Sequence, residues 1–168
     1  METVNFAPNA VIFKEGDKPD GVYLVISGNV EISRMEAGAK VPLAHIGADK
    51  VFGEMALIDN NPRSATAIAL APTQCMKGSP ENFAALMNKV DPAVKNALMQ
   101  ISNVIREKNK MKKTQLNQND VAVINSLKQK SEQLKHQIMT NQPLLDKIRK
   151  LDPFINGVFN GLLQLALK

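Results

Sequence analysis

Cysteine and histidine are scarce in this chain, and their scarcity excludes two kinds of site. Cys75 is the single cysteine among 168 residues, so no disulfide can form within the chain. His45 and His136 are the only two histidines. With Cys75 they are too few to supply the four ligands of an ordinary structural zinc site. The sequence therefore predicts neither a disulfide nor a metal site.

Long apolar segments are missing as well. No run of about 18 apolar residues occurs, which excludes a membrane-spanning helix. The chain begins Met-Glu-Thr-Val-Asn, with neither a basic start nor an apolar core, and so predicts no secretory signal. We therefore expect a soluble protein of the cytoplasm.

The common catalytic motifs are also absent. The chain contains no nucleophile elbow, no phosphate-binding P-loop and no HExxH metal motif. Neither histidine lies beside an acidic cluster. We predict that the chain is not an enzyme and that it carries no cofactor.

Charge and glycine are unevenly distributed along the chain. Apolar residues make up 44% and charged residues 22%, which is typical of folded domains. Residues 1–90 hold 8 Lys/Arg and 10 Asp/Glu, whereas residues 91–168 hold 13 and 6, so the net charge of +5 belongs to the second half. Seven of the nine glycines precede residue 90. These shifts indicate two architectures joined near residue 80.

Short β-branched runs separated by turn residues dominate the first part. Residues 22–26 end at Ser27-Gly28-Asn29, and residues 30–33 alternate apolar with polar side chains. Gly28-Asn29 between these runs predicts a tight hairpin. Residues 11–13, 41–46 and 66–70 form similar runs, and Cys75 fits an apolar strand position. The pattern predicts a β-sandwich or barrel.

Helix signals dominate the second part. Ser79-Pro80, Asp91-Pro92 and Asp152-Pro153 each combine a capping residue with proline at the first helical position. Asp120 and Pro143 indicate further helix starts, and residues 114–119 form a polar connection. After Asp91-Pro92, apolar residues recur at steps of three and four, as on one face of a long helix: Val94, Ala97, Leu98, Ile101, Val104, Ile105 and Met111.

An internal repeat is suggested by an offset of 61 residues. Lys89-Val90-Asp91-Pro92 matches Lys150-Leu151-Asp152-Pro153, although shared capping chemistry would produce much of this similarity. The apolar positions Val94, Leu98 and Ile101 correspond to Ile155, Phe159 and Leu162. The pattern indicates a duplicated helical hairpin.

Residues 52–66 contain the most informative pattern. Gly53 allows close approach of the backbone to a ligand, and Glu54 offers a carboxylate to paired hydroxyls. Residues 55–58 could form one helical turn whose free N–H groups face an anion. Arg63 can hold a phosphate through two hydrogen bonds, and Ser64 adds a hydroxyl donor. The set suits a ligand that carries both phosphate and ribose.

This segment resembles the phosphate-binding cassette of cyclic nucleotide-binding domains, the family that includes catabolite activator protein and the regulatory subunits of cyclic AMP-dependent protein kinase. The resemblance spans about residues 5–110 and includes residues 12–17, 23–30 and Gly47. It implies an α+β fold with an antiparallel β-roll or jelly-roll barrel, followed by an all-helical C-terminal extension. We expect a cyclic nucleotide-binding domain over residues 1–113 and the extension over residues 114–168.

The resemblance also implies the roles of the site residues. In that family Gly53 and Glu54 would contact the ribose 2′-hydroxyl, and Arg63 and Ser64 would hold the cyclic phosphate. The backbone amides of Met55 and Ala56 would complete the cradle. The expected ligand is a purine 3′,5′-cyclic mononucleotide, with cyclic AMP favoured and cyclic GMP possible. The base would be contacted from residues 106–110, and Arg63→Ala would abolish binding and leave the fold intact.

Three other interpretations stay open. Arg63 and Glu54 could form only an ion pair in an empty barrel. Residues 114–168 lack a recognisable winged helix-turn-helix, but a DNA-binding regulator could use a basic helical tail instead. Its cations would be Arg106, Lys108, Lys110, Lys112 and Lys113. A ligand-free scaffolding module is the third alternative.

The long helix after Asp91 predicts a homodimer, because its apolar stripe exceeds what one barrel face would cover. The alternative is that the later helices fold back over the stripe as a bundle. We expect a hinge at residues 88–92 that transmits ligand binding to the helices, and a last helix that offers a surface to a protein partner. Nucleic acid is not the expected partner.

Overall fold

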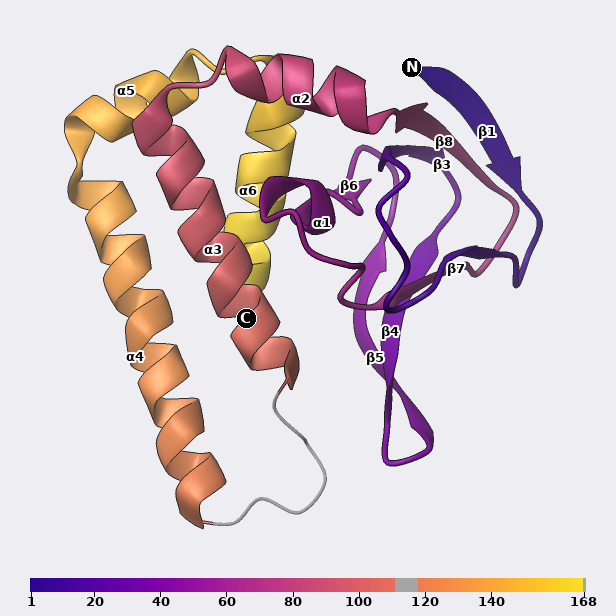
Figure 1. Ribbon diagram of the computed structural model, residues 1–168, viewed down its shortest axis with the longest axis horizontal. Coiled ribbons are helices and arrows are strands. Elements are labelled where there is room, and N and C mark those ends of the chain that lie inside the picture. Colours follow the sequence, from indigo (N-terminus) through magenta and orange to yellow (C-terminus); the bar gives the residue numbers. More distant parts are fainter. Residues whose placement is uncertain (111–117, 168) are drawn as a thin grey trace. The chain divides into compact units, whose positions relative to one another are not determined.

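A computed structural model describes residues 1–110 and 118–167. The chain forms two compact units, residues 1–88 and residues 89–168 (Figure 1). We call the first the β unit and the second the helical unit. The division differs from the predicted boundary at residue 113, because the long helix that follows Asp91 packs against the later helices.

The β unit consists of two four-stranded antiparallel sheets. One sheet has the order β1 (Glu2–Phe6), β8 (Thr73–Gly78), β3 (Val22–Ser27), β6 (Val51–Phe52). The other has the order β2 (Val11–Phe13), β7 (Thr66–Ala69), β4 (Val30–Glu36), β5 (Ala39–Ile46). Two helices complete the unit, α1 (Met55–Ile58) and α2 (Pro80–Asn88). The predicted α+β fold with an antiparallel β-roll is confirmed.

Alternating apolar residues of the two sheets form the core of the β unit. Phe13 and Tyr23 bring aromatic rings into it, and the rings of Tyr23 and Phe52 stack with centroids 5.1 Å apart. Cys75 occupies a fully buried strand position, as expected. Burial raises the pKa of its thiol to about 11, so Cys75 is a packing residue without thiolate character at neutral pH.

The predicted hairpin at Gly28-Asn29 is wrong. β3 pairs with β6 and β8, whereas β4 pairs with β5 and β7. The turn therefore carries the chain from one sheet to the other instead of closing a hairpin. Hydrogen bonds from elsewhere hold it, because Asn29 N–H donates to Thr73 Oγ1 at 3.2 Å and Asn29 O accepts from Leu70 N–H at 2.8 Å.

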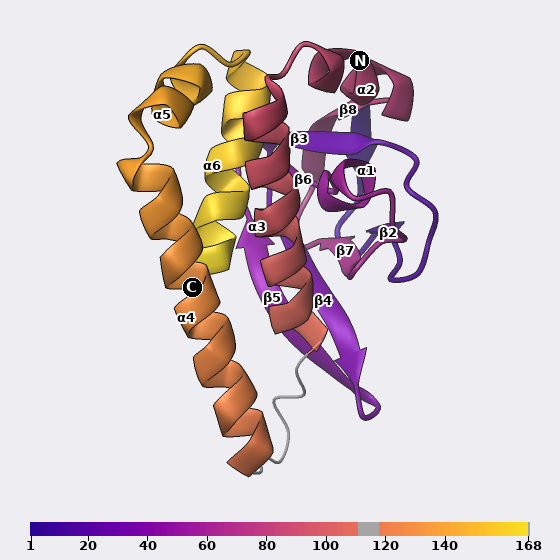
Figure 2. The same ribbon diagram turned by 60° about the vertical axis from the view of Figure 1, so that its left-hand side comes forward.

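The helical unit contains α3 (Pro92–Lys110), α4 (Gln118–Thr140), α5 (Gln142–Arg149) and α6 (Pro153–Leu167). α3 packs against α4, α5 and α6 (Figure 2). The long apolar stripe on α3 is buried, with Leu98 and Ile101 both 0% exposed. The fold-back alternative is thus what the structure shows, and the motive for a homodimer is removed. The homodimer itself stays a prediction.

Several sequence predictions fall on residues outside the described part. Met111 of the apolar stripe, residues 114–117 of the polar connection, and Lys112 and Lys113 of the basic cluster belong to that group. Within residues 1–110 and 118–167, no helix is both long and apolar enough to cross a membrane. The same residues contain no cluster of three His, Cys, Asp or Glu side chains suited to a metal ion.

Candidate functional site

Gly53 begins the segment that the sequence singles out. It follows β6 directly and has a φ of +81°, a conformation that glycine adopts without strain. A Cβ atom at Gly53 would lie 2.7 Å from a guanidinium nitrogen of Arg63. Both the backbone conformation and the close approach of Arg63 therefore require glycine here.

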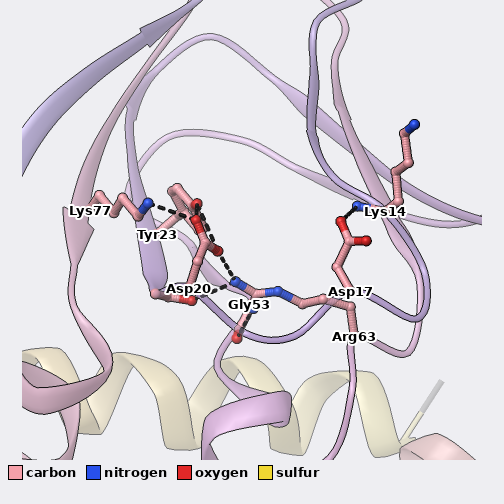
Figure 3. Close-up of polar contacts among 8 residues, drawn as sticks. Lys14, Asp17, Asp20, Tyr23, Gly53, Arg63 and Lys77 are labelled. Carbon is pink, nitrogen blue, oxygen red and sulfur yellow. Dashed lines mark hydrogen bonds and ion pairs between the residues drawn. The ribbon is translucent and has the colours of Figure 1, made fainter.

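Arg63 points into the β unit, and its side chain is only 1% exposed (Figure 3). One terminal nitrogen donates to Gly53 O. The other donates to Gly21 O and to Asp20 Oδ1, both at 2.8 Å. The guanidinium also lies over the ring of Phe13, 4.0 Å from its centroid. Arg63 is therefore held from three sides by the β unit.

The backbone of Arg63 is fixed by the loop between β2 and β3. Arg63 N–H donates to Asp17 O, and Gly16 N–H donates to Arg63 O, both at 2.9 Å. The loop is stabilised in turn by Lys14 N–H, which donates to the Asp17 carboxylate at 2.8 Å (Figure 3). These contacts place Arg63 against a loop far away in the sequence.

Asp20 links Arg63 to a second cation. Lys77 of β8 contacts the other carboxylate oxygen of Asp20 at 2.7 Å, and Tyr23 Oη donates to Asp20 at 3.0 Å. Burial alone would raise the pKa of Asp20, but the hydrogen bonds from Lys77, Arg63 and Tyr23 lower it to about 2. Asp20 is therefore ionised at any physiological pH, and two cations share its single charge.

Sequence reasoning missed Asp20, Gly21 and Lys77. Asp20 precedes Arg63 by 43 residues and Lys77 follows Asp20 by 57. Nothing in the local pattern of the loop distinguishes Asp20 from an ordinary turn residue. Gly21 carried one usable signal, since a Cβ there would lie 2.6 Å from Gly78 O, but that contact exists only once β3 and β8 pair.

Glu54 is buried beside the same loop, with 5% of the residue exposed. Burial raises the pKa of Glu54 to about 7, although its own backbone amide and the charge of Arg63 both lower it. The charge of Asp59 adds to the upward shift. At neutral pH about half of the Glu54 side chains are therefore protonated.

The predicted site residues lie on one continuous stretch around α1. Gly53 and Glu54 precede α1, Met55 and Ala56 form its first turn, and Ala56 is 2% exposed. Ser64 follows Arg63 and is half-buried. The ion-pair partner of Arg63 is Asp20; among the described residues, no ion pair joins Arg63 to Glu54.

One donor of Arg63 is unused. Its Nε atom is buried and has no hydrogen-bond partner among the described residues. A buried N–H group without an acceptor is unfavourable by about 1 to 3 kcal/mol. The local charge is also unbalanced, because Arg63 and Lys77 face one ionised carboxylate while Glu54 is half-neutral. Both observations fit an anion bound at this stretch.

The residues expected to contact a base belong to α3, which lies in the helical unit. Lys108 donates there to Ala166 O and to Ser131 Oγ. Burial lowers the pKa of Lys108. Its ammonium group therefore serves the C-terminal end of α6 within the helical unit.

Comparison with known proteins agrees with this geometry. Residues 3–90 match the model of the cyclic nucleotide-binding domain. The chain is 34% identical over 97 residues to a cyclic AMP receptor protein of Thermus thermophilus, an alignment that spans 57% of this chain and 45% of that protein. It is 28% identical over 95 residues to a cAMP-dependent protein kinase regulatory subunit of Dictyostelium discoideum, spanning 54% and 29% of the two chains.

A solved structure shows the likeness in three dimensions. The cAMP-bound form of the EAL enzyme Bd1971 aligns with a TM-score of 0.61 and 26% identity. The alignment covers 82% of this chain and 33% of that one. This chain spans less than half the length of the two curated relatives described above. From the fold, the geometry around Arg63 and the match over residues 3–90, the chain belongs to the cyclic nucleotide-binding domain family.

Proposed function

We propose that this chain is a non-catalytic receptor for a purine 3′,5′-cyclic mononucleotide, with cyclic AMP favoured over cyclic GMP. The unused Nε donor of Arg63 carries the proposal. A cyclic phosphate would supply the missing acceptor and the missing negative charge. The names of the relatives support cyclic AMP, since each of the three refers to it.

In this proposal each part of the segment has a role. Arg63 and Ser64 would hold the cyclic phosphate, and the amides of Met55 and Ala56 would add donors, because first-turn N–H groups have no partner within the helix. Glu54 would accept a hydrogen bond from the ribose 2′-hydroxyl. Gly53 would keep the backbone close to the ribose.

Calorimetric titration with cyclic AMP and with cyclic GMP tests the proposal. We expect heat with both and a lower dissociation constant for cyclic AMP. At 100 times its dissociation constant, the ligand should stabilise the β unit by about 2.7 kcal/mol. Absence of both heat and thermal shift with either nucleotide would exclude the receptor role and favour a ligand-free scaffold.

Arg63→Lys is the decisive variant, because it retains the charge but removes Nε and the fork. Binding should fall at least tenfold, which corresponds to about 1.4 kcal/mol. Arg34→Lys is the matched control: Arg34 also pairs with a carboxylate of the β unit, Glu36, but lies on β4 away from this segment. Equal losses in both variants would contradict a specific role of Arg63.

We further propose that binding is transmitted to the helical unit. The two units meet in sequence at Asn88 and Lys89, inside the hinge expected at residues 88–92. Asp91 caps α3 there by accepting from Ala93 N–H at 2.8 Å. A protein partner of the helices would be the output, and location in the cytoplasm stays the expectation from the sequence.

A further inference from the structure

α3 and α6 begin in the same way at positions 61 residues apart. Asp91 accepts from Ala93 N–H at 2.8 Å, and Asp152 accepts from Phe154 N–H at 2.9 Å. The first main-chain bonds match as well, with Asp91 O accepting at 3.0 Å from Lys95 N–H and Asp152 O accepting at 2.9 Å from Asn156 N–H. The two helix starts are thus equivalent in structure as well as in sequence.

Burial extends this equivalence over three further turns. Leu98 and Phe159 are 0% and 2% exposed, and Ile101 and Leu162 are both 0% exposed. Capping chemistry acts only on the first turn and cannot produce this agreement. The equivalent buried pairs are Val94 and Ile155, Ala97 and Val158, Leu98 and Phe159, Ile101 and Leu162, Ile105 and Ala166. Exposed positions also agree, at Asn96 and Gly157, Met99 and Asn160, Asn103 and Gln164.

The two helices lie side by side and run in the same direction, whereas α4 runs in the opposite direction (Figures 1 and 2). Lys108, near the end of α3, donates to Ala166 O, near the end of α6. Ser131 of α4 donates to the same carbonyl. α3 and its internal copy therefore form a parallel pair inside one chain.

We propose that α6 occupies the place of α3 from a second copy of this chain, and that the face of α3 beneath α6 is a latent docking surface for that second copy. The repeat identifies the occupant, because α3 presents the same spacing of apolar side chains as α6. The proposal does not depend on the ligand.

Packing and tethering both favour α6 over the second copy. At three equivalent positions α3 has the smaller side chain, Val94 for Ile155, Ala97 for Val158 and Leu98 for Phe159. An incoming α3 would leave cavities there. α6 also belongs to the same chain, so its effective concentration is of millimolar order. The native chain is therefore monomeric, and the surface opens only when α6 is loosened.

Phe159→Asp tests the proposal in the full chain, because it places a charge on the buried face of α6 and leaves α3 unchanged. Light scattering should give 18.4 kDa for the native chain and twice that mass for the variant. Asn160→Asp is the matched control, since it adds the same charge at the adjacent, exposed position of α6. It should remain monomeric.

A second substitution separates specific pairing from aggregation. Leu98→Asp added to Phe159→Asp should return the mass to that of one chain, because it places a carboxylate on the docking surface itself. A labelled peptide of residues 89–110 should bind Phe159→Asp and fail to bind the native chain. A Phe159→Asp variant that stays monomeric, or associates regardless of Leu98→Asp, overturns the proposal.

Discussion

Arg63 is both an interior residue and the proposed phosphate ligand, and the two roles make its variants informative in different ways. Arg63→Ala leaves Gly53 O and Gly21 O without their donor. Each buried acceptor left unpaired destabilises the fold by about 1 to 3 kcal/mol. The sequence-based expectation that Arg63→Ala leaves the fold intact is therefore replaced by a loss of stability together with a loss of binding.

Tyrosine fluorescence measures that loss in the β unit alone. Tyr23 is the single tyrosine and the chain has no tryptophan, so urea unfolding followed by this signal reports only the β unit. Arg63→Ala should unfold at clearly lower urea than Arg63→Lys, which keeps a donor. An unchanged midpoint in Arg63→Ala would show that the three contacts do not stabilise the fold.

Glu54 makes ligand affinity depend on pH. A ribose hydroxyl donates to the ionised carboxylate, whereas the unliganded side chain has a pKa raised by burial to about 7. Ligand binding therefore releases a proton. The dissociation constant for cyclic AMP should fall about tenfold between pH 6 and pH 8, and the fall should disappear in Glu54→Gln.

The same shift determines how stability without ligand depends on pH. The pKa of Glu54 in the folded chain, about 7, exceeds the model value of 4.5. Folding therefore takes up a proton, and stability is full below pH 4.5 and falls as pH rises towards 7. Glu54→Gln should remove this slope and stabilise the β unit at pH 8. A native chain with no such slope would contradict the shift.

At the scale of single elements, the helix starts can be tested one by one. Asp91 accepts from Ala93 N–H and also pairs with Lys147 at 3.1 Å. Asp91→Ala should reduce the free energy of unfolding of the helical unit by about 1 kcal/mol, and Asp91→Asn by less, because asparagine still caps. Helical circular dichroism during urea unfolding measures both. Equal effects would assign the stabilisation to the pair with Lys147.

The elements also show what sequence can and cannot predict. Asp91-Pro92 and Asp152-Pro153 mark helix starts correctly, because a cap acts within a single turn. Gly28-Asn29 was misread as a hairpin, since the choice between two sheets depends on strands β5 to β8, far along the chain. The role of Asp20 was missed for the same reason. Gly53, Glu54 and Arg63 were recognised only because they lie close together in sequence.

At the scale of the whole molecule, the question is whether ligand binding reaches the helical unit. Hydrogen exchange of residues 89–110 and 118–167 should change at least about fivefold when cyclic AMP binds, which corresponds to a coupling of about 1 kcal/mol. Arg63→Lys with the same ligand is the control and should show no change. Unchanged exchange in the native chain, with binding confirmed by calorimetry, would make the helical unit a static appendage.

The parallel pair of α3 and α6 has a consequence for how the protein is made. The ribosome completes α3 at Lys110 and α6 only at Leu167. At about 5 to 20 residues per second, several seconds separate the two events. During that interval the nascent chain carries the uncovered face of α3, and neighbouring nascent chains on one messenger carry the same face. The order of synthesis therefore gives a second copy its one natural opportunity to reach α3 before α6 does.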